Sequence, residues 1–221
     1  MRPVVKICGL MRAEDVAMCL IYGADILGFV VDYPIPVPWN LNPAAAKELM
    51  SSVSGRAKTC VVTGGSPENT IRLAKELKPD YIQLHASETL ADVGYLVGKL
   101  GEFGVKIIKA VFPDTPDLEK TATDFCKTGI HSLLFDARTP NNAITGGIAD
   151  LSLFRSLQIA AIIPIILAGG ITPENVTNIV LMSKAEAIDI MTGLELSPGV
   201  KDEAKVAALF QALREMPMAD Q

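Results

Sequence analysis

Eight short runs of β-branched and other apolar residues recur along the chain. They are nearly continuous in apolar character and do not alternate with polar residues, which is typical of strands buried on both faces of a parallel sheet. The runs are "PVVKIC" (3–8), "DILGFVV" (25–31), "KTCVVT" (58–63), "DYIQLH" (80–85), "VKIIKAV" (105–111), "HSLLFDA" (131–137), "IIPIILAGG" (162–170) and "AIDIMTG" (187–193).

A segment with the apolar spacing of a helix follows each run. The clearest are "SPENTIRLAKELK" (66–78) and "TPENVTNIVLMS" (172–183), which place Pro at an early helical position and Glu next. The other six helices are predicted at 12–23, 42–53, 88–100, 115–129, 150–160 and 200–216.

Eight strand–helix units without a Pro/Gly-rich linker indicate an α/β fold, a (β/α)₈ TIM barrel formed as a single domain over residues 1–221. A doubly wound open sheet is the alternative, and the number of units favours the barrel.

Composition narrows the class of ligand. The chain has 20 Lys and Arg against 25 Asp and Glu, a formal charge of -5, and none of its stretches resembles the basic patch of a nucleic-acid binder. An anionic ligand must therefore be held locally, by backbone amides or by a few cations. We expect a small-molecule ligand and no nucleic acid.

The cysteine spacing and the apolar runs argue against a metal site and a membrane span. Cys8, Cys19, Cys60 and Cys126 show no metal-ligand spacing with the two histidines, so no metal is expected. Charges interrupt the first twenty residues, and no apolar run approaches the roughly 20 residues of a membrane span. We expect a cytoplasmic protein with free thiols and no contact with membranes.

In a barrel, chemistry collects where the strands end. Gly169 and Gly170 follow the seventh run, and Thr192 and Gly193 follow the eighth. Glycines let the backbone approach a phosphate, and a helix N-terminus after the turn supplies N–H donors. A Gly-Gly tight turn is the alternative for one pair, but two such loops side by side favour a phosphate site.

Cys8 and Asp136 end the first and sixth runs, so the barrel would point both into one mouth. A thiol and a carboxylate there suit general base and general acid chemistry on a small carbohydrate. The alternatives are a buried apolar role for Cys8 and, for Asp136, capping of the turn or pairing with Arg138. His85 either orients a ligand or is a barrel histidine with its hydrogen bonds satisfied.

The motifs "KICGL" with "ED", "GADILGFV", "YIQLH", "IIKA", "LLFDA", "LAGGITPENV" and "SPGVKD" occur in this order. Together they resemble the phosphoribosylanthranilate isomerase family of tryptophan biosynthesis, over essentially the whole chain. The resemblance implies a cofactor-free Amadori rearrangement of N-(5-phosphoribosyl)anthranilate to 1-(2-carboxyphenylamino)-1-deoxyribulose 5-phosphate, an aldose-ketose isomerisation. It implies a monomer or a homodimer.

The resemblance also implies roles for residues. The cysteine matching Cys8 removes the proton from sugar C2, and the aspartate matching Asp136 protonates the ring oxygen. Gly169, Gly170, Thr192 and Gly193 fall at the phosphate-binding positions. Lys6, His85 and Arg138 are further candidates for substrate contact. The pKa of the thiol is expected to be lowered by Lys6 or by a cationic intermediate nearby.

The chain departs from the family in two loops. The usual "SPR" after the second strand, whose arginine is similar in role to a clamp for the anthranilate carboxylate, is "VVDYPIPVPWN" here, without a cation. The "GGTG" after the sixth strand is "TGGIAD". Asp32 is expected to repel a carboxylate, and Arg138 or Arg12 is a candidate replacement cation. Trp39 and Tyr33 are candidates for stacking on an aromatic ring, and an exposed-loop or packing role is the alternative for both.

Two other functions remain open on these residues. One is a paralogous barrel isomerase acting on a different phosphosugar. The other is a non-catalytic barrel that binds a phosphorylated metabolite. Retention of both Cys8 and Asp136 disfavours the second.

Overall fold

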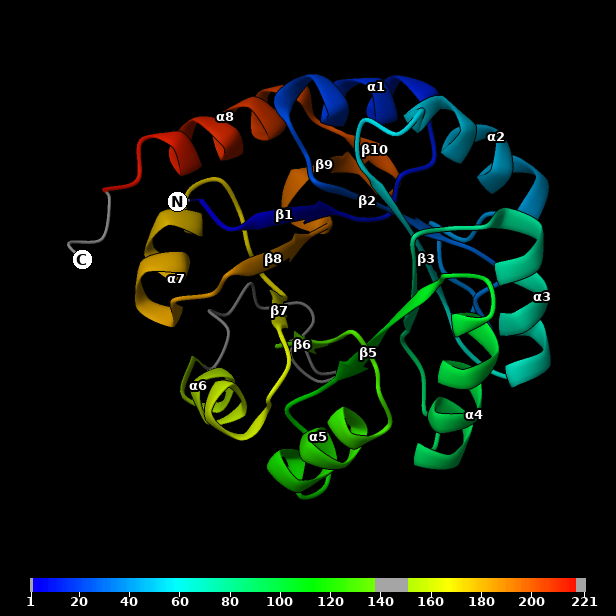
Figure 1. Ribbon diagram of the computed structural model, residues 1–221. Coiled ribbons are helices and arrows are strands. Elements are labelled where there is room, and N and C mark those ends of the chain that lie inside the picture. The colour runs from blue at the N-terminus through cyan, green and yellow to red at the C-terminus, as the bar shows by residue number, and fades with distance from the viewer. Residues whose placement is uncertain (1, 138–150, 218–221) are drawn as a thin grey trace.

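The computed structural model describes residues 2–137 and 151–217. Eight parallel strands pair in chain order, and β1 also pairs with β8, which closes the barrel (Figure 1). The strands are β1 Val4–Ile7, β2 Ile26–Val30, β3 Lys58–Thr63, β4 Tyr81–Leu84, β5 Lys106–Val111, β6 Ser132–Asp136, β7 Ile165–Ala168 and β8 Ala187–Ile190. The predicted (β/α)₈ barrel is confirmed.

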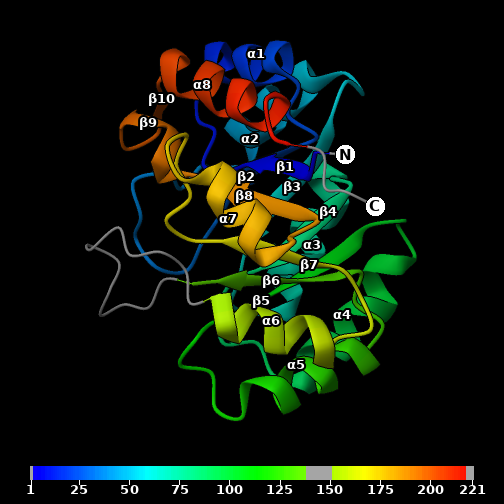
Figure 2. The same cartoon turned by 90° about the vertical axis from the view of Figure 1, so that its left-hand side faces the viewer.

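Helices form a ring outside the strands, and Figure 2 shows the same layers from the side. They are α1 Ala13–Tyr22, α2 Pro43–Val53, α3 Pro67–Leu77, α4 Leu90–Gly101, α5 Leu118–Lys127, α6 Leu151–Ala160, α7 Val176–Ser183 and α8 Glu203–Arg214. In the described part of the chain, none is long and apolar enough to cross a membrane.

Side chains explain several helix starts. Asn42, Ser66 and Thr89 each accept a hydrogen bond from a backbone N–H in the first turn of α2, α3 and α4. At α4 the Asp92 carboxylate also accepts from the Thr89 N–H, which completes a capping box. Local sequence therefore fixes where these helices begin.

Two apolar layers make up the core. The larger lies between strands and helices and includes Ile7, Phe29 and Phe135. The smaller fills the barrel interior and includes Cys60, Ile108, Leu134 and Cys8. The interior is thus packed, and a ligand has room only at its ends.

Two features differ from the sequence prediction. The helix expected to begin at Thr172 begins at Val176, because the Asn175 side chain accepts from the Thr172 N–H and donates to the Gly170 carbonyl, which holds 172–175 as a turn. After β8 the chain also forms a short 3₁₀ helix, η1 (Thr192–Leu194), and an antiparallel pair, β9 (Glu195–Ser197) and β10 (Val200–Lys201), which the pattern did not predict.

Candidate active site

A cavity of about 230 Å³ opens at the carboxyl ends of the strands. Its lining brings together most of the predicted site residues: Cys8, His85, Asp136, Gly169, Gly170, Thr192 and Gly193. These residues come from β1, β4, β6, β7 and β8 or from the loops that follow them. Closure of the barrel is what makes them neighbours.

Cys8 follows the end of β1, where its N–H donates to the Ile190 carbonyl at 3.0 Å. The residue is 4 % exposed and forms part of the cavity wall. Burial raises the pKa of the thiol above its ordinary value, and the Lys6 ammonium partly opposes this rise. Lys6 therefore lowers the pKa of the thiol as predicted, but the opposite effect of burial is larger.

Lys6 lies below Cys8 inside the barrel and is not among the residues that line the cavity. Its Nζ donates to Asp189 Oδ2 on β8 at 2.8 Å, and the pair is buried. Attraction to Asp189 and to the neighbouring thiols raises the pKa of Lys6 in spite of burial. Lys6 is thus a fixed positive charge under the cavity.

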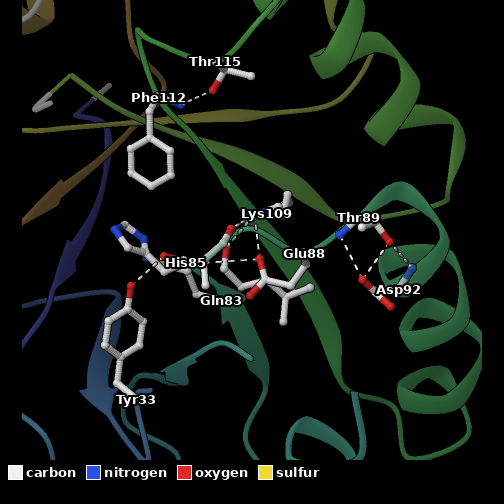
Figure 3. Close-up of polar contacts among 11 residues, drawn as sticks. Tyr33, Gln83, His85, Glu88, Thr89, Asp92, Lys109, Phe112 and Thr115 are labelled. Carbon is white, nitrogen blue, oxygen red and sulfur yellow. Dashed lines mark hydrogen bonds and ion pairs between the residues drawn. The ribbon is translucent and has the colours of Figure 1, made fainter. Parts of the chain in front are cut away.

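Asp136 ends β6 and is buried, and its Oδ2 lies 3.7 Å from His85 Nε2. The Gln83 side-chain amide contacts His85 Nδ1 at 3.0 Å, and Phe112 packs edge-on against the imidazole (Figure 3). With the Gln83 amide donating to Nδ1, a neutral His85 carries its hydrogen on Nε2, toward Asp136. His85 therefore faces the cavity with a defined orientation.

The two glycine-bearing loops meet at the same edge. Gly169 and Gly170 have φ values of 96° and 69°, a conformation that favours glycine. A Cβ on Gly193 would overlap the Ile171 carbonyl oxygen, so only glycine lets the loops after β7 and β8 pack this closely. Thr192 begins η1, which turns backbone N–H groups of this segment toward one end.

The loop after β2 contributes Tyr33, Val37 and Trp39 to the cavity wall. Asp32, expected to repel a substrate carboxylate, instead pairs with Arg72 of α3 at 2.5 Å and does not line the cavity. Arg12 is exposed at the start of α1, 3.5 Å from Glu14, and is also absent from the lining. Arg138 and the "TGGIAD" segment lie outside the described residues.

Sequence reasoning missed two polar residues of the lining, Asp189 and Gln83. Asp189 Oδ1 and Gln83 Oε1 are buried and have no hydrogen-bond partner among the described residues. Buried acceptors are normally satisfied, so both atoms are suited to accept from a ligand or a water. The signal was available: each is a polar residue inside an otherwise apolar strand, "AIDI" and "YIQL".

Among the described residues, no three His, Cys, Asp or Glu side chains gather closely enough to hold a metal ion. The cavity thus presents a thiol, a carboxyl group, an imidazole and a glycine-rich edge. This set suits proton transfer on a phosphorylated substrate.

Comparison with known proteins agrees with this geometry. The family model described as N-(5'phosphoribosyl)anthranilate (PRA) isomerase matches residues 5–212. The isomerase of Nitrobacter winogradskyi is 34% identical over 220 residues, covering 96% of this chain and 92% of the relative. That of Halorubrum lacusprofundi is 33% identical, covering 97% and 99%.

Solved structures match over the whole barrel. The phosphoribosyl anthranilate isomerase of Thermotoga maritima has a TM-score of 0.83 at 26% identity, covering 97% of this chain and 99% of the other. That of Thermus thermophilus has a TM-score of 0.80 at 29% identity, covering 98% and 100%. The resemblance inferred from the motifs is confirmed, and the chain belongs to the N-(5'-phosphoribosyl)anthranilate isomerase family.

Proposed function

We propose that this barrel carries out the isomerisation of its family, the rearrangement of N-(5-phosphoribosyl)anthranilate in tryptophan biosynthesis, with Cys8 as general base and Asp136 as general acid. One observation carries the assignment. Both side chains line a single cavity that the glycine loops after β7 and β8 also line. A base, an acid and a phosphate anchor are the groups that this reaction requires.

Asp136, as the carboxylic acid, donates its proton to the ring oxygen while the bond between that oxygen and C1 breaks. The amine nitrogen then forms an iminium with C1. The Cys8 thiolate removes the proton from C2, and the iminium becomes an enolamine. The hydroxyl on C2 loses its proton as C1 gains one, which gives the ketone. Each proton transfer needs a positioned acid or base, and no redox partner is consumed.

The substrate phosphate is proposed to bind between Gly169, Gly170, Thr192 and Gly193. The left-handed glycines and the contact of Gly193 with the Ile171 carbonyl support a backbone cradle at this edge. One solved relative, 25% identical, holds reduced 1-(o-carboxyphenylamino)-1-deoxyribulose 5-phosphate. We propose the same class of ligand here, with no cofactor.

The test is turnover, followed as loss of phosphoribosylanthranilate fluorescence. We expect turnover by the parent protein and a fall in kcat of about 10²–10⁴-fold for Cys8→Ser and for Asp136→Asn, because each change removes one proton-transfer group. Cys126→Ser is the matched control, since Cys126 is a buried cysteine of α5 outside the cavity. A parent without turnover contradicts the function; full activity in both variants contradicts the residue roles.

We also propose a single domain over residues 1–221, a monomer or homodimer, and a cytoplasmic location. One solved relative is described as monomers of a dimeric phosphoribosylanthranilate isomerase. The four cysteines are free, which suits a reducing compartment. Sedimentation of the purified protein distinguishes the two oligomeric states.

A further inference from the structure

The loop after β2 contributes three side chains to the cavity wall. Tyr33, Val37 and Trp39 are partly buried and pack on the barrel interior, whereas the residues between them are mostly exposed. Two of the three side chains are aromatic. The loop therefore turns one apolar face toward the ligand space and its other face toward solvent.

The polar atoms of both aromatic side chains are already bonded to protein. Trp39 Nε1 donates to Glu195 Oε1 at 2.9 Å. The Tyr33 hydroxyl donates to the His85 carbonyl at 2.7 Å, as Figure 3 shows. These bonds leave ring faces and edges for contact with a ligand. The three side chains of this wall thus offer an aromatic group a packing surface and offer a carboxylate no free donor.

The loop holds this surface before any ligand arrives. The Asn40 side chain accepts from the Tyr33 N–H at 2.9 Å and donates to the Tyr33 carbonyl at 3.0 Å, which closes the loop on itself. Pro34, Pro36 and Pro38 fix three φ angles between these contacts. A surface ordered in advance loses little conformational entropy on binding.

Glu195 ties Trp39 to the phosphate side of the cavity. The same Oε1 that accepts from Trp39 also accepts from Lys201 Nζ at 3.0 Å and from the Gly199 N–H at 3.3 Å. Glu195 directly follows η1, which contains Thr192 and Gly193. Trp39 is therefore fixed relative to the proposed phosphate loop.

We propose that Trp39 determines specificity for the aromatic half of the substrate, its indole face packing on the aryl ring so that the enzyme selects the ring more than the carboxylate attached to it. The inference rests on the proposed function. It predicts that N-(5-phosphoribosyl)aniline, which lacks the carboxylate, is isomerised with a kcat/KM within about tenfold of the anthranilate substrate, because contact between apolar rings is retained.

The first test uses the unaltered protein, because Trp39 is the single tryptophan of the chain. The reduced product analogue named above is bound, and acrylamide quenching of tryptophan fluorescence is measured. We expect the quenching constant to fall at least twofold with the analogue and to stay constant with inorganic phosphate. An unchanged constant, when calorimetry shows the analogue bound, overturns the proposal.

A relocated tryptophan is the matched control. Trp39→Phe with Tyr95→Trp moves the fluorophore to α4, where residue 95 is 51% exposed. The analogue should not alter quenching at this position. Protection there as well as at Trp39 would point to a global change and would contradict a local contact.

Kinetics give the second test. Trp39→Leu should raise KM for the anthranilate substrate about tenfold, with little change in kcat, whereas Trp39→Phe should raise it less than threefold because a ring is retained. Unchanged affinity for inorganic phosphate verifies that the variants are folded. Normal KM in Trp39→Leu, or a loss of more than a hundredfold with the aniline substrate, overturns the proposal. A parent inactive on both substrates instead overturns the proposed function.

Discussion

The surroundings of Cys8 determine the pKa of its thiol. Burial raises the pKa of its thiol, the Lys6 ammonium lowers it, and Asp189 raises it again to a smaller extent than Lys6 lowers it. The proposed base is therefore more basic than an ordinary thiol, and the thiolate forms only at higher pH.

This balance predicts the pH dependence of Cys8 alkylation by iodoacetamide, mapped by mass spectrometry. The rate follows the thiolate fraction, so its midpoint should lie above 9.0, the ordinary thiol value. Replacing the ion pair by Lys6→Met with Asp189→Leu removes the larger lowering influence, so the midpoint should move to still higher pH. A midpoint below that of the unfolded protein contradicts the balance.

Gly193 is the residue on which the contact between the phosphate loops depends. Gly193→Ala would place a Cβ against the Ile171 carbonyl oxygen, too close for both atoms to stay in place, so the loops must separate. We expect affinity for inorganic phosphate to fall more than tenfold, measured by calorimetry. Gly98→Ala, on α4 and away from the cavity, is the control and should leave phosphate affinity unchanged.

At the scale of elements, short sequence features of helix α4 affect its stability without involving the cavity. Helix α4 begins with the Thr89–Asp92 capping box and contains Gly94 and Gly98 on its exposed side. Neither glycine has a positive φ, and a Cβ added at either position would meet open space, so neither glycine is needed for the fold. The helix thus carries one stabilising and two weakening features.

Two substitutions in α4 should change stability in opposite directions. Thr89→Ala removes the cap and should lower the free energy of unfolding by about 1 kcal/mol. Gly98→Ala should raise it by about 0.5–1 kcal/mol, because alanine loses less backbone entropy on folding. Urea denaturation measures both. If both substitutions raised or both lowered the free energy of unfolding, the stability of α4 would not depend on these local features.

At the scale of the whole molecule, the barrel contains buried ion pairs that join one strand to another strand or loop. Lys109 of β5 pairs with Glu88 at 2.7 Å and donates to the Ala86 carbonyl at 2.8 Å (Figure 3). Burial lowers the pKa of Lys109, and the Glu88 charge opposes that shift. The pair thus depends on both members being present.

Glu88→Gln leaves the Lys109 ammonium buried without its countercharge and should lower the free energy of unfolding by about 3–5 kcal/mol. The double change Glu88→Leu with Lys109→Met should lower it less, since no charge remains buried. Glu102→Gln, in the exposed pair with Lys99, is the control and should have no measurable effect. A double variant less stable than the single one contradicts this explanation.

The roles of Cys8 and Asp136 stay a prediction, but the sequence by itself determined the alternation of strands and helices and which residues stand at the strand ends. These depend on local periodicity and on chain order, because each parallel strand delivers its carboxyl end to the same mouth. Cys8, Asp136 and the glycine loops were therefore predictable before the structure, as were the start of α3 and the proline that follows its cap.

The tertiary structure decided which polar groups meet. Lys6 and Asp189 are 183 residues apart, and Trp39 and Glu195 are 156 apart, so no local pattern relates them. The late start of α7 depends on the Asn175 side chain, which makes turn contacts in place of helical ones. Closure of the barrel supplies these partners, since it places β8 beside β1 and the loop after β2 beside the residues that follow η1.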